Sequence, residues 1–165
     1  VKFTGAKRGA HGGLKTLIAT VKELAPAAEE MGMLLCLENH VNNAMESIGD
    51  YDEIFAAIDS PNVGMCLDSG HFIGANIQLD DVVDRFHSRV NHVDLKDCKA
   101  FGVYKTVRFG EGVADLSAMV EQLLARGYRG YLVVEQAPPI SQETLEADIA
   151  EAFRLFRRYE GAARA

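Results

Sequence analysis

Short apolar runs alternate with helical patterns of apolar residues along the whole chain of 165 residues. These runs are too short for helices, and the run that begins at Met33 follows Gly32, as expected for buried strands. We therefore predict strands over residues 2–4, 33–38, 63–68, 90–95 and 131–135. Repeated strand–helix units of this kind predict an α/β fold in which helices cover a parallel sheet.

Apolar residues at helical spacing predict a helix in each interval between these strands. The first is expected over residues 14–24, with Pro26 kinking it or restarting it. The second begins at Asp50, where Glu53 completes the pattern of a capping box. Asp115 caps a later helix. The remaining expectations are helices near 82–86, over 116–124 and over 141–159, and a loop over 99–113.

Acidic residues fall at the carboxyl ends of the predicted strands. Glu38, Asp68 and Glu135 each close an apolar run, and Asp94 lies near the end of a fourth. This edge of a parallel sheet is where α/β proteins build their active sites. Carboxylates that converge there repel one another and lose hydration unless a cation joins them. The sequence therefore predicts a divalent cation, with Mn²⁺ or Mg²⁺ favoured and Co²⁺ or Zn²⁺ as alternatives.

Residues two apart on a strand share a face, so a second layer of side chains lies below the carboxylates. We interpret its two cysteines as small apolar fillers and its histidine as a hydrogen-bonded interior residue. The layer consists of Cys36, Cys66, His92 and Val133. The residues expected to face the helices are Leu37, Leu67, Leu95 and Val134.

Five short segments carry the acidic residues and the polar residues around them: 37–40, 64–71, 92–97, 110–112 and 133–135. In content and order they resemble the xylose isomerase-like TIM barrels, the sugar-phosphate isomerase and epimerase group. The resemblance implies a parallel (β/α) TIM-barrel fold, present as an incomplete barrel of about five strands that match the fourth to the eighth.

The resemblance also implies that residues 1–165 are a single domain, the C-terminal part of such a barrel, with its first three βα units absent. A complete barrel takes roughly 250 residues. The chain has 165 residues and begins with Val1 rather than Met. We therefore expect a truncated or partial chain.

The ligand set of the family carries over residue by residue. In the family a divalent metal is bound by Glu, Asp, His and Glu from the last four strands, which correspond here to Glu38, Asp68, Asp94 and Glu135. Asp94 stands where the family has histidine, so the implied site is all-carboxylate. That donor set favours Mn²⁺ or Mg²⁺ over Zn²⁺.

Four further residues are candidates for substrate binding. The resemblance implies that His71 contacts substrate oxygens, with a turn-capping loop histidine as the alternative. His40 offers a polar group beside it. Lys96 reaches either an anionic group of the substrate or a ligand carboxylate, and Arg108 lies in the loop expected across the mouth of the barrel.

These residues lead to a hypothesis of function. We expect a divalent-metal-dependent isomerase or epimerase of a small sugar, polyol or keto-acid, working through an enediolate. Glu38 and Glu135 are the expected proton-transfer pair. A dehydratase on the same scaffold is the nearest alternative, because it differs only in the bond that breaks after proton removal. A non-catalytic chain, truncated or completed by a partner, is the third hypothesis.

Composition removes several other classes. The chain has 17 Lys and Arg against 24 Asp and Glu, a net charge of −7, which argues against nucleic acid or an anionic membrane as partner. No apolar run approaches the roughly 18 residues of a membrane span, and no leader pattern opens the chain. Three cysteines without a disulfide pattern fit a reducing compartment, so we expect a cytoplasmic protein.

Two strands of such an incomplete barrel would lack a neighbour. These are the strand at residues 2–4 and the strand ending at Glu135. Unpaired edges associate with other strands. We therefore expect a homo-oligomer, or association with a chain that supplies the missing strands, and a small polyhydroxylated molecule as substrate.

Overall fold

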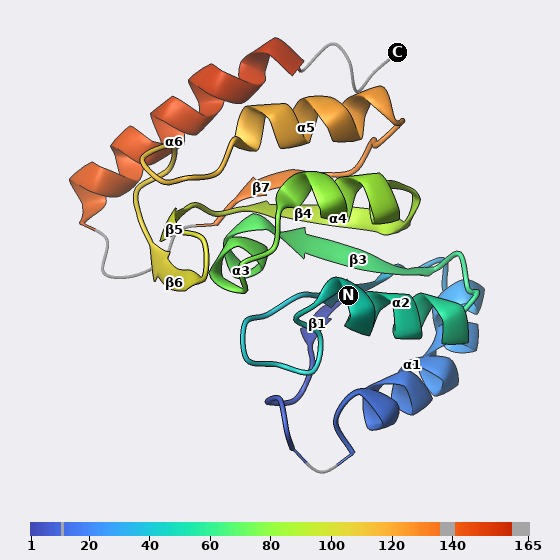
Figure 1. Ribbon diagram of the computed structural model, residues 1–165. Coiled ribbons are helices and arrows are strands. Elements are labelled where there is room, and N and C mark those ends of the chain that lie inside the picture. The colour runs from blue at the N-terminus through green and yellow to red at the C-terminus, as the bar shows by residue number, and fades with distance from the viewer. Residues whose placement is uncertain (11, 136–140, 160–165) are drawn as a thin grey trace.

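The computed structural model describes residues 1–10, 12–135 and 141–159. Its centre is a five-stranded sheet in the order β1-β2-β3-β4-β7, in which every neighbouring pair is parallel (Figure 1). The strands are β1 (Lys2–Thr4), β2 (Leu35–Glu38), β3 (Val63–Asp68), β4 (Val90–Leu95) and β7 (Leu132–Val134). Within the described residues the sheet does not close into a barrel, and β1 and β7 are its edges.

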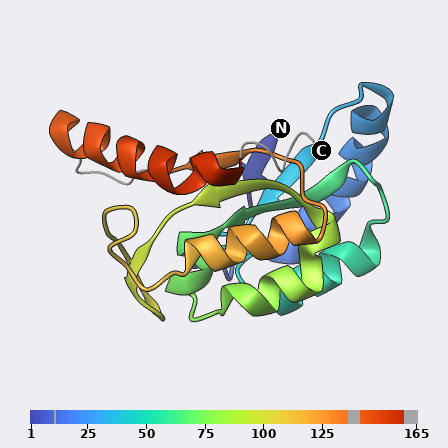
Figure 2. The same ribbon diagram turned by 90° about the horizontal axis from the view of Figure 1, so that it is seen from above.

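Helices connect the strands as the sequence predicts. In Figure 2, α2, α4 and α5 lie side by side along one side of the curved sheet, and α6 lies at the end where β7 is. The longer helices are α1 (Gly13–Glu30), α2 (Ile48–Ala57), α4 (Leu79–Phe86), α5 (Leu116–Ala125) and α6 (Gln142–Phe156), and short 3₁₀ turns lie at His87–Arg89 and Arg157–Tyr159. None of the helices in the described residues has the length and apolar character that a membrane crossing requires.

The core lies between the sheet and this row of helices. Leu37, Leu67 and Leu95 are completely buried in it, as expected from strand alternation. The opposite face of the sheet is open to solvent in places. Val133 is 40% exposed there, and the His92 side chain is 25% exposed.

Helix α1 continues through Pro26, so of the two expected outcomes the restart does not occur. Three other local expectations were wrong. The capping box of α2 pairs Ser47 with Asp50, so the helix begins earlier than predicted. A short helix, α3 (Ser69–Gly74), follows β3 directly and contains His71, which was expected in a loop. Part of the predicted loop is a hairpin of β5 (Cys98–Ala100) and β6 (Val103–Thr106).

A one-residue bulge in β4 sets the register of the central strands. Met65 of β3 pairs with Val90, but the next residue, Cys66, pairs with His92. Asn91 is therefore the extra residue of the bulge. Because side chains alternate along a strand, one extra residue moves all later side chains to the other face.

The bulge decides which residues of β4 reach the open face. Val90 before it and Val93 after it both belong to the core. His92 and Asp94 consequently lie on the open face, beside the corresponding residues of β3. Gly64 leaves the space that the bulged residue occupies.

Gly64→Ala should destabilise the fold by about 1–3 kcal/mol. An added Cβ would lie 2.3 Å from Nδ2 of Asn91 and 2.6 Å from the carbonyl oxygen of Arg89. Urea unfolding followed by circular dichroism measures the loss. Gly49→Ala is the matched control, since its nearest atom would be 3.8 Å away, and it should be neutral or mildly stabilising. Equal stability of the two variants would contradict this role of Gly64.

Candidate metal centre

The structure brings the four predicted carboxylates together at the C-terminal edge of the sheet. Glu38 ends β2, Asp68 ends β3, Asp94 lies in β4 and Glu135 follows β7. One carboxylate oxygen from each lies within 4.8 Å of the other three. Parallel pairing explains this: Asp68 and Asp94 are register partners, and the backbone N–H of Glu135 donates to the Leu95 carbonyl at 3.0 Å. We call these four residues the carboxylate group.

Two lysines neutralise part of this charge. Nζ of Lys96 lies 2.9 Å from Oδ2 of Asp68 and 3.0 Å from Oε1 of Glu135. Nζ of Lys2 lies 2.7 Å from Oδ2 of Asp94 and 3.3 Å from Oε1 of Glu38. With every group ionised, four carboxylates and two ammonium groups leave a formal charge of −2.

Two neighbouring residues position Lys96: Ser69 contacts its backbone, and Gly70 leaves room for its side chain. The Ser69 hydroxyl accepts from the Lys96 N–H at 2.9 Å and lies 2.6 Å from its carbonyl oxygen. The aliphatic stem of Lys96 runs across Gly70, where an added Cβ would lie 2.7 Å from Cγ. Only 5% of the lysine side chain is exposed. The structure thus shows the ion pair that was predicted as one alternative for this residue, and its substrate role stays a prediction.

Burial and ion pairing act in opposite directions on these groups. Burial raises the pKa of the Asp68 carboxyl to about 7, although Lys96 and the His71 N–H oppose it. Burial would also raise the pKa of Asp94, but hydrogen bonds from Lys2 and Cys66 hold it below its ordinary value. Asp68 is therefore a carboxylate whose negative charge a bound cation would stabilise strongly.

An aromatic wall of His40, His71 and Tyr104 stands beside the carboxylate group. The rings of His71 and Tyr104 are stacked with centroids 4.5 Å apart, and the ring of His40 lies 3.8 Å from that of His71. The Val41 N–H donates to Nδ1 of His71 at 3.4 Å, which places the ring hydrogen on Nε2. Nε2 lies 3.3 Å from the Tyr104 hydroxyl and 3.7 Å from Oδ2 of Asp68.

Burial lowers the pKa of His71 to about 3, so its ring is neutral. Tyr104 was not among the predicted site residues, because its hairpin was expected to be a loop. The run of residues 103–106 after the turn at Gly102, which has a φ of 75°, could have indicated this strand. Gly74 leaves room for the Tyr104 ring, because a Cβ added at Gly74 would lie 2.8 Å from Cδ2 of the tyrosine.

Arg108 has other partners. Its Nε donates to Oδ1 of Asp148 on α6 at 2.9 Å, and its Nη1 lies 3.4 Å from Oε1 of Glu111. Asp97 fixes the loop nearby, because its carboxylate accepts from the N–H groups of Gly112 at 2.8 Å and of Ala114 at 3.1 Å. These contacts give no support to the predicted substrate role of Arg108, which stays a prediction.

Comparison with known proteins identifies the family. The model of the xylose isomerase-like TIM barrel matches residues 2–159. The chain belongs to this family. The predicted family and fold type are thereby confirmed.

The relatives of this xylose isomerase-like chain carry the names of enzymes. The inosose dehydratase of Histophilus somni (strain 129Pt) is 32% identical over 141 residues, 72% of this chain and 47% of the relative. The chain spans about half the length of the curated relatives it matches.

Two solved structures show the same fold. A D-tagatose 3-epimerase-like protein has a TM-score of 0.76 at 20% identity, covering 99% of this chain and 62% of its own. The IOLI protein with a binding zinc atom has a TM-score of 0.74 at 22% identity, covering 88% and 57%. At such identities the likeness supports the fold rather than a shared chemistry.

The carboxylate group of this xylose isomerase-like chain fits a divalent cation. Its donors are hard oxygen atoms, and the residual formal charge of −2 equals the charge that such an ion would balance. Oε2 of Glu135 is buried and has no hydrogen-bond partner among the described residues. An unpartnered carboxylate oxygen facing like charges is the kind of atom that a cation satisfies.

Lys96→Met should destabilise the protein by about 3–5 kcal/mol, because it leaves the Asp68 carboxyl buried without its ion-pair partner. Lys99→Met, at an exposed lysine three residues on, should cost less than about 0.5 kcal/mol. Urea unfolding compares the two, and Mn²⁺ should restore part of the loss in Lys96→Met. Equal stability of the two variants would contradict the role assigned to Lys96.

Proposed function

We propose that this chain forms the catalytic edge of a divalent-metal-dependent enzyme that removes a proton from carbon beside the carbonyl of a polyhydroxylated ketone. The observation that carries the proposal is the convergence of four strand-end carboxylates within 4.8 Å. Glu38, Asp68, Asp94 and Glu135 would hold the cation. When bound, such a cation stabilises negative charge that develops on substrate oxygens.

The donor set supports Mn²⁺ or Mg²⁺ as the ion of this group, since all four ligands are carboxylates. The IOLI protein, which has a similar fold, binds a zinc atom, and this keeps Zn²⁺ as the alternative. Asp94 decides between Mn²⁺ or Mg²⁺ and Zn²⁺ in this proposal, because the family has histidine at this position and this chain has a carboxylate.

Glu135 is the proposed proton acceptor. One of its oxygens is engaged by Lys96, and the other, Oε2, is buried without a partner among the described residues. Glu38 lies on β2, across β3 and β4 from Glu135, and is the proposed group that returns or supplies a proton from the other side. Lys96 orients Glu135 through the 3.0 Å ion pair.

The aromatic wall is proposed to steady the substrate. Neutral His71 presents its Nε2 hydrogen beside Asp68 and can donate to a substrate oxygen that gains charge. His40 and Tyr104 both pack against its ring, with ring centroids 3.8 Å and 4.5 Å away. Their flat surfaces suit the carbon face of a ring-shaped polyol better than an open chain.

Dehydration is the outcome that the relatives favour. After proton removal, a hydroxyl on the adjacent carbon leaves with a proton as water and a carbon–carbon double bond forms. In isomerisation or epimerisation, the proton instead returns to carbon. The sequence favoured isomerisation, but the curated relatives reported above are inosose dehydratases, and the epimerase-like neighbour shares the fold at lower identity. We therefore place dehydration of a keto-polyol first and epimerisation second.

The open edges β1 and β7 support association with further strands, from a second copy or from another chain. This completion of the barrel is part of the proposal, because the chain covers about half of its curated relatives.

Proton exchange in D₂O tests the proton-acceptor role directly. The Mn²⁺-loaded protein should introduce deuterium beside the carbonyl of a keto-inositol, and mass spectrometry should also detect a product lighter by one water. Glu135→Gln should slow the exchange by about 10²–10⁴-fold, whereas Glu53→Gln, at an exposed glutamate of α2, should leave it unchanged. Full exchange in a Glu135→Gln protein that still binds Mn²⁺ would contradict the role of Glu135.

Asp68→Asn should lower Mn²⁺ affinity at least about tenfold, because it replaces a ligand charge inside a buried site. Isothermal titration calorimetry measures the change. Asp81→Asn, which removes an exposed carboxylate of α4, should bind Mn²⁺ as the unmodified chain does. Equal affinity of both variants would show that the carboxylate group is not the metal site.

A further inference from the structure

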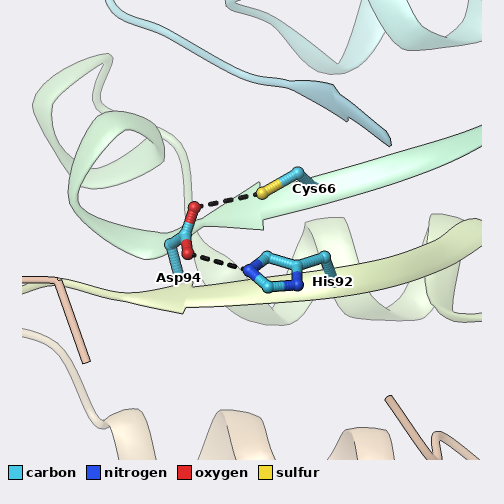
Figure 3. A group of neighbouring side chains, drawn as sticks. All are labelled: Cys66, His92 and Asp94. Atoms are coloured by element: carbon cyan, nitrogen blue, oxygen red, sulfur yellow. Dashed lines mark hydrogen bonds and ion pairs between the residues drawn. The ribbon is translucent and has the colours of Figure 1, made fainter. Parts of the chain in front are cut away.

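A second cluster of ligand-type side chains shares Asp94 with the carboxylate group and extends one layer further inside. In Figure 3, Cys66 of β3 and His92 of β4 flank the carboxylate of Asp94 from two sides. Sγ of Cys66 lies 3.1 Å from Oδ2, and Nε2 of His92 lies 3.1 Å from Oδ1. One ligand atom from each residue lies within 4.8 Å of the other two.

The strand register creates this cluster. The bulge at Asn91 makes His92 the partner of Cys66, so a thiol and an imidazole stand side by side on the open face. Asp94 follows two residues after His92 and points to the same side. Without the bulge, His92 would face the helices and the cluster would not form.

We propose that Cys66, His92 and Asp94 form a second metal position that takes Zn²⁺ or Co²⁺. A thiolate, an imidazole and a carboxylate are common zinc ligands, and three protein ligands leave a fourth position for water. The sulfur and nitrogen donors distinguish this position from the carboxylate group, whose oxygen donors suit Mn²⁺ or Mg²⁺. Binding releases the thiol proton of Cys66 to solvent.

The surroundings of the sulfur support this assignment. Cys66 is completely buried, it pairs with His92 across the two strands, and its thiol is directed at a carboxylate. The His92 side chain is 25% exposed, which provides access for an ion and for its water ligand. Cys36 on β2 is similarly buried, but its sulfur has no histidine or carboxylate hydrogen-bond partner among the described residues.

Lys2 competes with a metal at this position. Its ammonium group lies 2.7 Å from the same Asp94 oxygen that the Cys66 thiol contacts. The lysine side chain is 41% exposed and has a second partner in Glu38, so it can give up Asp94 when a cation binds. Lys2→Gln should therefore tighten Co²⁺ binding at this position.

Cobalt spectroscopy tests the proposal without any assay of activity. Co²⁺ added to the full chain should produce the near-ultraviolet charge-transfer band of a thiolate ligand, and Zn²⁺ but not Mg²⁺ should abolish it. Cys66→Ser should remove the band, while Cys36→Ser, at the matched buried cysteine, should keep it. Circular dichroism of both variants checks that they remain folded.

Two results would overturn the second metal position: bound Co²⁺ without a charge-transfer band, or a band that persists in Cys66→Ser. If Cys66→Ser does not fold, His92→Gln replaces it as the test, and an unchanged Co²⁺ affinity in that variant would also overturn the proposal. The inference does not depend on the proposed function. If the protein binds Mn²⁺ but gives no thiolate–cobalt band, only the second metal position is contradicted. If it gives the band but does not bind Mn²⁺, only the carboxylate site is contradicted.

Discussion

Repulsion among like charges at the C-terminal edge of the sheet is the constraint on which the site depends. Parallel strands in register necessarily bring their ends together, so acidic residues at four strand ends meet whether or not a ligand is present. Lys96 relieves the repulsion between Asp68 and Glu135, and Lys2 does the same for Asp94 and Glu38. Two lysines still leave an excess of negative charge, which makes a divalent cation the natural completion of the site.

Glycines around the site leave the space that the side chains of the site need. Gly70 lets the Lys96 stem pass close to α3, Gly74 lets Tyr104 stack on His71, and Gly64 accommodates the bulge of β4. Each glycine acts by lacking a Cβ where another side chain must approach. The geometry of the carboxylate group therefore depends on positions that carry no chemistry of their own.

The sequence was sufficient to predict the sheet and the carboxylate group, because short apolar runs indicate buried strands and parallel strands align their ends. It was not sufficient for features that depend on tertiary packing. The bulge at Asn91 depends on space left by Gly64 on a different strand, and the ion pair of Arg108 depends on Asp148 of α6. Tyr104 reaches the site only because residues 98–106 form a hairpin that packs on α3.

The most direct test of the carboxylate group as a metal site is anomalous diffraction from crystals of this chain grown with Mn²⁺. An anomalous peak is expected among the carboxylates of Glu38, Asp68, Asp94 and Glu135, within coordination distance of Oε2 of Glu135. A map without a peak there, in which Lys2 and Lys96 keep their ion pairs to all four carboxylates, would contradict metal binding and show that the lysines alone balance the charge.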